Sequence, residues 1–165
     1  MNSTPGGVES GYSLERIFAN DLQFTGHPVA DDMPEIEAPM QFGWDWTVDS
    51  PESFSVRVTL SVLPTKARPE TTAVTLTAGF SRRGEPTVPL VDFASKHAPA
   101  IMMPFVREII FSLSGRGLHG GLLLPPFNVL AMMSNLDVNE SEGMKQLRGD
   151  SELAKLLDSR AADGG

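Results

Sequence analysis

Alternating apolar and polar residues mark three segments of the chain as β-strands. Residues 54–62 carry an apolar side chain at every even position and Ser, Arg or Thr at every odd one. Residues 74–80 repeat this pattern, and residues 35–46 repeat it around Pro39, which is typical of a strand at an edge or a bulge. Successive side chains of a strand point to opposite faces. The pattern therefore predicts an antiparallel sheet that is covered on one side.

The earlier segment, residues 12–24, fits two different elements. Leu14, Ile17, Phe18 and Leu22 have the spacing of a helix face. The aromatic and β-branched residues of the same segment, Tyr12 and Phe24 among them, fit an irregular strand with a bulge. The pattern alone leaves both alternatives open.

A strongly apolar segment at residues 100–114 predicts a long helix. Its main stripe consists of Met102, Phe105, Val106, Ile109 and Leu113, and Arg107 and Glu108 are its only charged residues. A helix this apolar is buried on more than one side, and a single four-stranded sheet cannot cover it all. We therefore expect another subunit to cover the remainder. The preceding residues 82–98, with their glycine and prolines, are expected to be irregular.

The rest of the chain predicts shorter elements and two flexible ends. Residues 119–126 form an apolar but non-helical connection, and Asn128 is placed to cap a second helix that runs to about Leu136. Residues 1–11 predict a flexible arm, and residues 137–165 predict a flexible acidic tail with a short helical pattern at 152–160. One domain, residues 12–136, lies between them.

Composition excludes several classes of protein. The chain has no cysteine, which excludes a disulfide scaffold and a cysteine zinc site, and its net charge of −8 argues against binding to nucleic acid. It has neither a signal-peptide pattern nor an apolar run long enough for a membrane span, so we expect a cytoplasmic protein without membrane insertion. It also has no phosphate loop and no nucleophile elbow. We therefore expect no enzyme, no cofactor and no metal.

Acidic residues gather near the start of the chain. The first 53 residues contain ten acidic residues and one base, and Asp31, Asp32, Glu35 and Glu37 stand close together among them. This asymmetry favours docking of a basic partner, or it serves solubility alone.

Apolar side chains without any accompanying chemistry are the most distinctive remaining feature. They are Met40, Phe42, Trp44 and Trp46 on one strand face, Leu122, Leu123 and Leu124 in the connection, and Met132 and Met133 on the last helix. One interpretation is a core with an oligomer interface. The other is an adaptable groove for varied apolar segments, because methionine repacks easily and aromatic rings supply contact area.

Three stretches of the sequence carry distinctive motifs. They are residues 14–24 (LERIFANDLQF), residues 104–117 (PFVREIIFSLSGRG) and residues 122–132 (LLLPPFNVLAM). Together they resemble the bacterial export chaperone family SecB. The second and third resemble the family's long helix and the segment that opens its last helix. The order and spacing agree over about residues 12–136, although Thr25 and Thr77 stand where the family usually has glutamate.

The resemblance implies an α+β subunit. Its four-stranded antiparallel sheet is followed by a long helix, an extended crossover loop and a shorter helix, and residues 12–24 become a strand. It also implies a homotetramer, built as a dimer of dimers around the long helices. We expect Phe105, Ile109, Leu113 and Leu76 at this interface.

The same resemblance implies an ATP-independent holdase. Such a chaperone holds unfolded precursor proteins in apolar grooves and delivers them to the translocase ATPase SecA. The apolar residues given above, together with Phe127, are the expected client surface, and Asp21 is the expected contact to SecA. SecB-like relatives also serve toxin–antitoxin systems, so a chaperone or adaptor dedicated to one partner such as an antitoxin is the alternative function.

Overall fold

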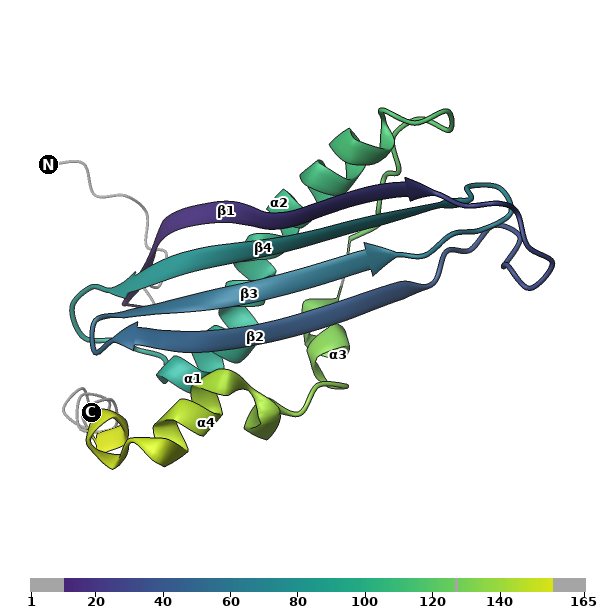
Figure 1. Ribbon diagram of the computed structural model, residues 1–165. Coiled ribbons are helices and arrows are strands. Elements are labelled where there is room, and N and C mark those ends of the chain that lie inside the picture. The colour runs from purple at the N-terminus through teal and green to yellow at the C-terminus, as the bar shows by residue number, and fades with distance from the viewer. Residues whose placement is uncertain (1–10, 127, 156–165) are drawn as a thin grey trace, which may run out of the picture.

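The computed structural model describes residues 11–126 and 128–155, which form one antiparallel sheet with helices on one face (Figure 1). The strands are β1 (Tyr12–Gly26), β2 (Met40–Ser50), β3 (Ser53–Val62) and β4 (Glu70–Arg82), in the order β1-β4-β3-β2. The predicted four-stranded antiparallel sheet is confirmed. The residues expected to form an N-terminal arm lie, except for Gly11, outside the described residues.

Two bulges explain the ambiguous pattern of β1. The register against β4 shifts between Leu14 and Arg16 and again between Ala19 and Asp21. Each bulge inserts one residue and turns the following side chains over. Leu14, Ile17 and Leu22 therefore share the helix-facing side of the strand, although their spacing is not two. An alternating pattern that two bulges interrupt has apolar residues at intervals other than two, which can resemble the spacing of a helix face. In the structure these residues form the strand β1.

The strand β2 begins later than the sequence predicts. Residues 27–39 cross the end of the sheet, because β1 and β2 lie at its opposite edges. Hydrogen bonds from the amides of Lys66 and Ala67 to the carbonyls of Pro34 (2.8 Å) and Glu35 (3.1 Å) attach this connection to the β3–β4 turn. The alternation of residues 35–39 thus belongs to a connection, and β2 pairs with β3 only from Met40 onward.

The helical region starts earlier than predicted. It comprises α1 (Leu90–Asp92), the π-helical turn η1 (Phe93–His97) and α2 (Ala98–Ser114), so the expectation of irregular structure is wrong from Leu90 to Ala98. Phe93 is buried in a cluster with the rings of Tyr12, Phe54 and Phe80. Packing of the Phe93 ring in the core stabilises this helical turn, although the glycine and prolines of residues 82–98 favour irregular structure.

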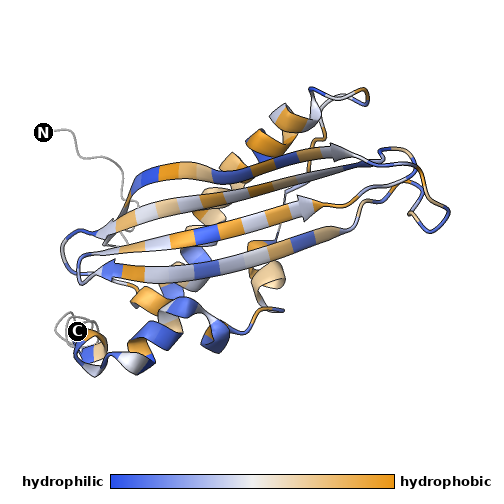
Figure 2. Cartoon of the chain, viewed as in Figure 1, coloured by the Kyte–Doolittle hydropathy of each residue, from blue (hydrophilic) through white to orange (hydrophobic). Residues whose placement is uncertain are grey.

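The core lies between the sheet and α2. Its sheet side consists of Phe54, Val56, Val58, Leu60 and Val62 from β3 and Val74, Leu76, Ala78 and Phe80 from β4. Met102, Val106 and Ile110 of α2 pack against it from the other side and are buried. Figure 2 shows the resulting alternation of hydrophobic and hydrophilic bands along the strands.

The chain after the crossover is more ordered than predicted. In α3 (Val129–Met133) the amide of Ala131 donates to Asn128 Oδ1 at 3.1 Å, which confirms the predicted cap. The acidic tail predicted for residues 137–165 is wrong over its described part. There η2 (Val138–Glu140) and α4 (Glu142–Gly149) form, and α4 contacts β2. The later part of the predicted 152–160 helix lies outside the described residues.

The helix α4 is attached to β2 through Trp46. The indole Nε1 of Trp46 donates to Ser141 Oγ at 3.1 Å, and the same oxygen accepts from the amide of Met144 and so caps α4. Gly143 lies against the indole ring, and a Cβ on this residue would come within 2.2 Å of a ring atom. The acidic composition of this segment concealed a docked helix, because few of its side chains are apolar. Met144 and Leu147 nevertheless pack against the core, beside the close contact at Gly143 and the Ser141 cap.

Candidate functional site

Apolar side chains of α2 that face away from the sheet form the first part of the candidate site. Phe105 is 39% exposed, and Ile101 and Phe111 are exposed to a similar degree. Ile109 and Leu113 are half-buried. The far side of the helix is therefore uncovered within one chain, as the sequence predicts. Leu76 is a correction, because it is 1% exposed in the subunit's own core and has no surface left for a partner.

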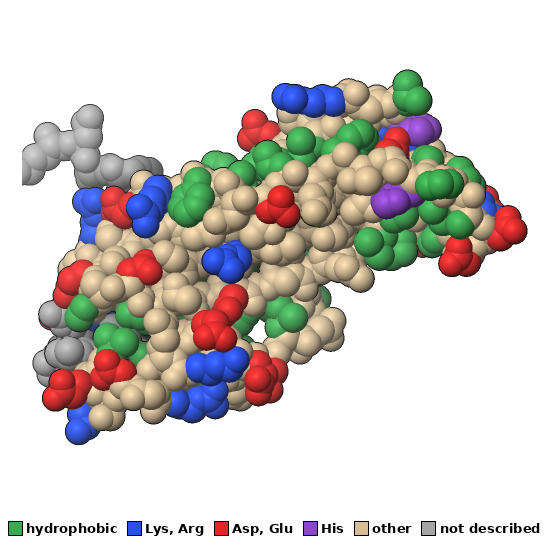
Figure 3. Space-filling model, in the orientation of Figure 1, with side chains coloured by type: hydrophobic (Ala, Val, Ile, Leu, Met, Phe, Trp, Pro, Cys, Tyr) green, Lys and Arg blue, Asp and Glu red, His purple; other side chains and the backbone are tan. Residues whose placement is uncertain are grey.

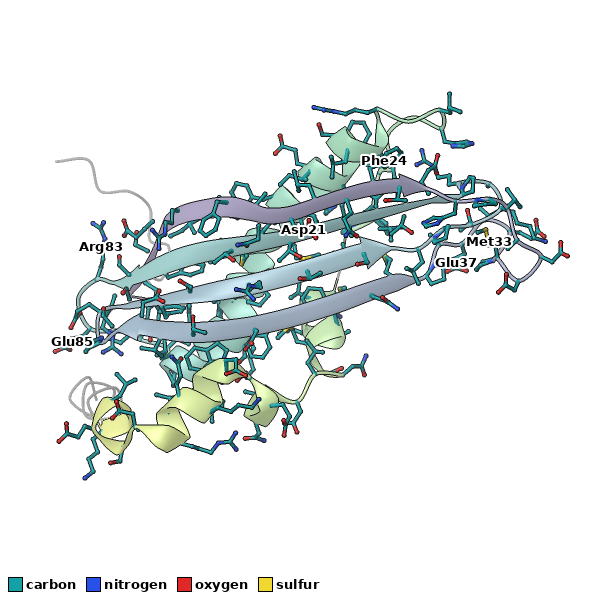
Figure 4. The ribbon with its side chains drawn as sticks, in the orientation of Figure 1. Asp21, Phe24, Met33, Glu37, Arg83 and Glu85 are labelled. Atoms are coloured by element: carbon teal, nitrogen blue, oxygen red, sulfur yellow. The ribbon has the colours of Figure 1, made fainter. Side chains whose placement is uncertain are left out.

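The outer edge of β1 lies next to the C-terminal half of α2. The strand pairs with β4 on one side, and no described strand pairs with its other side. Leu22 and Phe24 are exposed on its helix-facing side, and the ring of Phe24 approaches Gly117 just after α2 (Figure 4). Figure 3 shows hydrophobic side chains along this border between β1 and α2. We give the name β1–α2 surface to Leu22 and Phe24 of β1 together with the exposed face of α2 that carries Ile101, Phe105 and Phe111.

The predicted client residues of β2 lie on its helix-facing side, and their exposure decreases along the strand. Met40 is exposed, Phe42 and Trp44 are half-buried, and Trp46 is 1% exposed. The indole of Trp44 donates to the carbonyl of Ala94 at 2.9 Å, which holds the ring against η1. The assignment of Trp46 to the client surface is wrong, because α4 covers its side chain.

The crossover and α3 supply the remaining predicted client residues. Leu123 is exposed, and Leu122 and Met132 are half-buried. Leu124 and Met133 are buried in the core, so their assignment to a client surface is also corrected. Phe127 lies outside the described residues. The half-buried residues Phe42, Trp44, Leu122 and Met132 all pack against the same core, so the structure brings these parts of the predicted surface to one side of the sheet.

Sequence reasoning missed two exposed apolar side chains in this region. Leu118 is 98% exposed in the loop that follows α2, and Leu130 is exposed on α3. The loop is held by Arg68, whose guanidinium donates to the carbonyls of His119 and Gly120, and by a contact between His119 and Glu70. A leucine in the glycine-rich loop Gly117-Leu118-His119-Gly120 was a usable signal, because glycines supply no side chain to cover it. We call Met40, Leu118, Leu123 and Leu130 the crossover surface.

The opposite face of the sheet is polar and bears Asp21. Thr59 and Thr75 are hydrogen-bonded across this face at 2.9 Å, and Thr77 donates to Asn20 Oδ1. Asp21 is exposed on β1, as expected, and forms no ion pair with any described residue. The guanidinium of Arg16 lies 6.0 Å from the ring centroid of Phe18 instead of pairing with Asp21.

Charged residues mark the two ends of this face. Glu15 accepts from Ser81 and Arg83, and these hydrogen bonds hold the pKa of its carboxyl below the ordinary value. The acidic residues of the 27–39 connection lie at the other end (Figure 4), where Glu35 pairs with Lys66 at 2.8 Å. Asp21 lies between these ends and is not gathered with the other acids.

Neither a metal centre nor a membrane helix is found in the described part of the chain. No group of three or more His, Cys, Asp or Glu residues there has metal-binding geometry. None of the helices in residues 11–126 and 128–155 has the length and apolarity needed to cross a bilayer.

Comparison with known proteins identifies the fold. No family model matches the chain. Among solved structures, the Mycobacterium tuberculosis SecB-like chaperone Rv1957, in complex with a ChAD peptide from the antitoxin Rv1956 HigA1, superposes with a TM-score of 0.58 at 18% identity. The match covers 71% of this chain and 88% of Rv1957. The fold is SecB-like.

A second solved structure matches less well. It is a protein of unknown function from Streptococcus agalactiae, with a TM-score of 0.48 and 12% identity, and the match covers 70% of this chain and 97% of that one. The resemblance in the sequence and the superposition on Rv1957 thus agree on the architecture of the subunit.

Proposed function

We propose that this chain is an ATP-independent chaperone that holds unfolded client proteins. The observation that carries the proposal is the crossover surface, four exposed apolar side chains on three elements of a SecB-like fold. Isolated exposed apolar residues are ordinary, but several on one side of a sheet mark an interaction surface. Methionine and leucine adapt to varied partners, which suits a client without a fixed sequence.

The half-buried rim beside this surface supports the same function. Phe42, Trp44 and Met132 each expose part of a large side chain next to the core. The first residues of β2 also lie at a sheet edge, where an extended client segment can add backbone hydrogen bonds. Affinity then depends on apolar area and backbone pairing, and little on client sequence or salt.

Assembly as a homotetramer belongs to the proposal. The β1–α2 surface leaves an apolar helix face and an unpaired strand edge together, and a second copy of this chain buries both at once. Self-association through identical surfaces is the commonest form of assembly. We propose dimers joined through this surface and paired into tetramers around α2.

Delivery of precursors to SecA in the cytoplasm is the downstream step that we propose. Asp21 is the carboxylate available for this contact on the open face of the sheet. A dedicated adaptor for one antitoxin is the second candidate function, and it is favoured by the antitoxin peptide in the complex of Rv1957.

One experiment separates these functions. The full chain is mixed with two unrelated chemically denatured proteins, and their aggregation is followed by light scattering. A general holdase suppresses aggregation of both proteins. If neither is suppressed, the holdase function is contradicted and the dedicated adaptor remains, and binding to antitoxin peptides is then measured.

Leu123→Ser weakens client binding several-fold. Phe18→Ser, which removes an exposed apolar side chain from the opposite face, is the matched control and leaves it unchanged.

A further inference from the structure

A cavity of about 280 Å³ lies at the end of the sheet away from the crossover surface. Among the described residues, three parts of the chain line it: the start of β1 with the end of β4, the connection into α1, and the C-terminal helical segment. Its walls are largely apolar and consist of Val88, Leu90, Val91, Met144, Leu147 and Ala154. A small, mostly apolar pocket with a few polar groups is the usual form of a small-molecule site.

The polar groups of this cavity are of one kind. Arg82 and Arg148 line it, and none of the described residues that line it is acidic. The hydroxyl of Tyr12 donates to the carbonyl of Val88 at 3.0 Å, and its oxygen interacts with the side chain of Arg82. Arg148 donates to the carbonyl of Asn139. The cavity therefore presents positive charge beside apolar walls.

Arg82 has a hydrogen-bonding group without a partner. Its Nη1 is buried, and no described residue accepts a hydrogen bond from it. A buried donor without an acceptor is rare in folded proteins and unfavourable, particularly on a charged group. A carboxylate matches the fork of a guanidinium and supplies the missing acceptor.

We propose that this cavity binds a carboxylic acid with an apolar body. The carboxylate accepts hydrogen bonds from the guanidinium of Arg82, and the apolar body lies between the α1 connection and Met144 and Leu147 of α4. A neutral alcohol offers Nη1 only an uncharged acceptor, which forms a weaker hydrogen bond than a carboxylate, and a cation is repelled by the two arginines. This chemistry is offered by a medium-chain fatty acid and by the C-terminus of a peptide that ends in an apolar residue.

Binding at this site also affects α4. The ligand contacts α4 and the α1 connection together, so it links the helix that covers Trp46 to the rest of the subunit. Occupancy therefore raises the melting temperature, as expected for any ligand that binds only the folded state. The site is independent of the proposed client surface, which lies elsewhere.

The test is calorimetric titration of the full chain with octanoate, with octan-1-ol and octylammonium as controls. We expect octanoate to bind and the two controls to bind at least ten-fold more weakly. A second pair of probes, a short peptide that ends in leucine and its C-terminal amide, shows whether peptide carboxylates enter as well. Failure of both carboxylates to bind, or equal binding of octanoate and octan-1-ol, overturns the proposal.

Variants locate the site. Arg82→Gln weakens octanoate at least ten-fold, whereas Arg57→Gln, with the same change of charge on the exposed face of β3, leaves it unchanged. Ala154→Trp fills the cavity without altering Arg82 and blocks binding, which keeps the test valid if Arg82→Gln does not fold. Equal effects of Arg82→Gln and Arg57→Gln, or full binding by Ala154→Trp, contradict this location.

Discussion

The two edges of the sheet are treated in opposite ways. At the β2 edge, the side chain of Gln146 accepts a hydrogen bond from the amide of Val48 and donates one to its carbonyl. Nearby, Asp45 accepts a hydrogen bond from the amide of Glu142. The β1 edge has no such cover from described residues, and Leu22 and Phe24 are exposed beside it. An uncovered strand edge is a template for another chain. The comparison indicates that this chain covers the later part of the β2 edge, from Asp45 to Val48, by itself. It leaves the β1 edge uncovered, and this is the edge at which we propose that a second copy binds.

The largest expected effect concerns the open edge. We expect the wild-type chain to form an oligomer well above 17.8 kDa and Phe105→Asp to dissociate it, because an unpaired charge in an apolar interface costs about 3–5 kcal/mol. Light scattering at micromolar concentration measures the mass. Gln41→Asp, exposed on the opposite face of the sheet, is the control for added charge. A wild-type mass near 18 kDa contradicts the proposed assembly.

The closed edge is broken by a substitution at Gly143. In Gly143→Val the new side chain collides with the indole of Trp46 and displaces α4, at an expected cost of about 1–3 kcal/mol. The tryptophan fluorescence then shifts to longer wavelength, and urea unfolding shows the lower stability. Gly149→Ala lies in the same helix with nothing within 4 Å of its Cβ, and we expect it to leave both unchanged. Equal behaviour of the two variants refutes the docking of α4 on Trp46.

A smaller effect is expected for the bonds that cover the β2 backbone. Gln146→Ala removes the side chain that bonds to both polar groups of Val48, at a cost of about 1 kcal/mol. Hydrogen exchange of the Val48 amide accelerates while the amides of β3 keep their protection. Lys145→Ala removes only an exposed pair with Glu142 and serves as the comparison, since such pairs contribute little. Unchanged exchange at Val48 in Gln146→Ala argues against this cover.

The smallest effect on the fold is expected on the open face. Asp21→Arg leaves stability within about 0.5 kcal/mol, because its side chain is exposed and unpaired among the described residues. It lowers the association rate with SecA, and the difference shrinks at high salt, where attraction between charges is screened. Surface plasmon resonance at two salt concentrations measures both. Absence of wild-type binding at low salt removes the export role and favours the dedicated adaptor.

Local patterns in the sequence determined most of the architecture. The alternation in residues 54–62 and 74–80 has a direct cause in the pleat of a half-buried strand, and both segments form strands. The apolar period of residues 100–114 and the Asn128 cap likewise act within a few residues. The resemblance to SecB then identified residues 12–24 as a strand. A family motif can be recognised across the two bulges of β1, whereas the bulges interrupt the two-residue alternation that would otherwise indicate a strand.

Long-range contacts decided the candidate site. Trp46 and Met40 lie on the same strand face with similar apolar character, yet one is buried and the other exposed, because α4 returns to β2 from about a hundred residues away. Leu76 was likewise assigned to an interface, although α2 covers it within the subunit. A sequence pattern determines which side of an element is apolar. Only the tertiary structure decides what covers that side, because burial depends on which distant segment fits against it, here through Gly143 and the Ser141 cap.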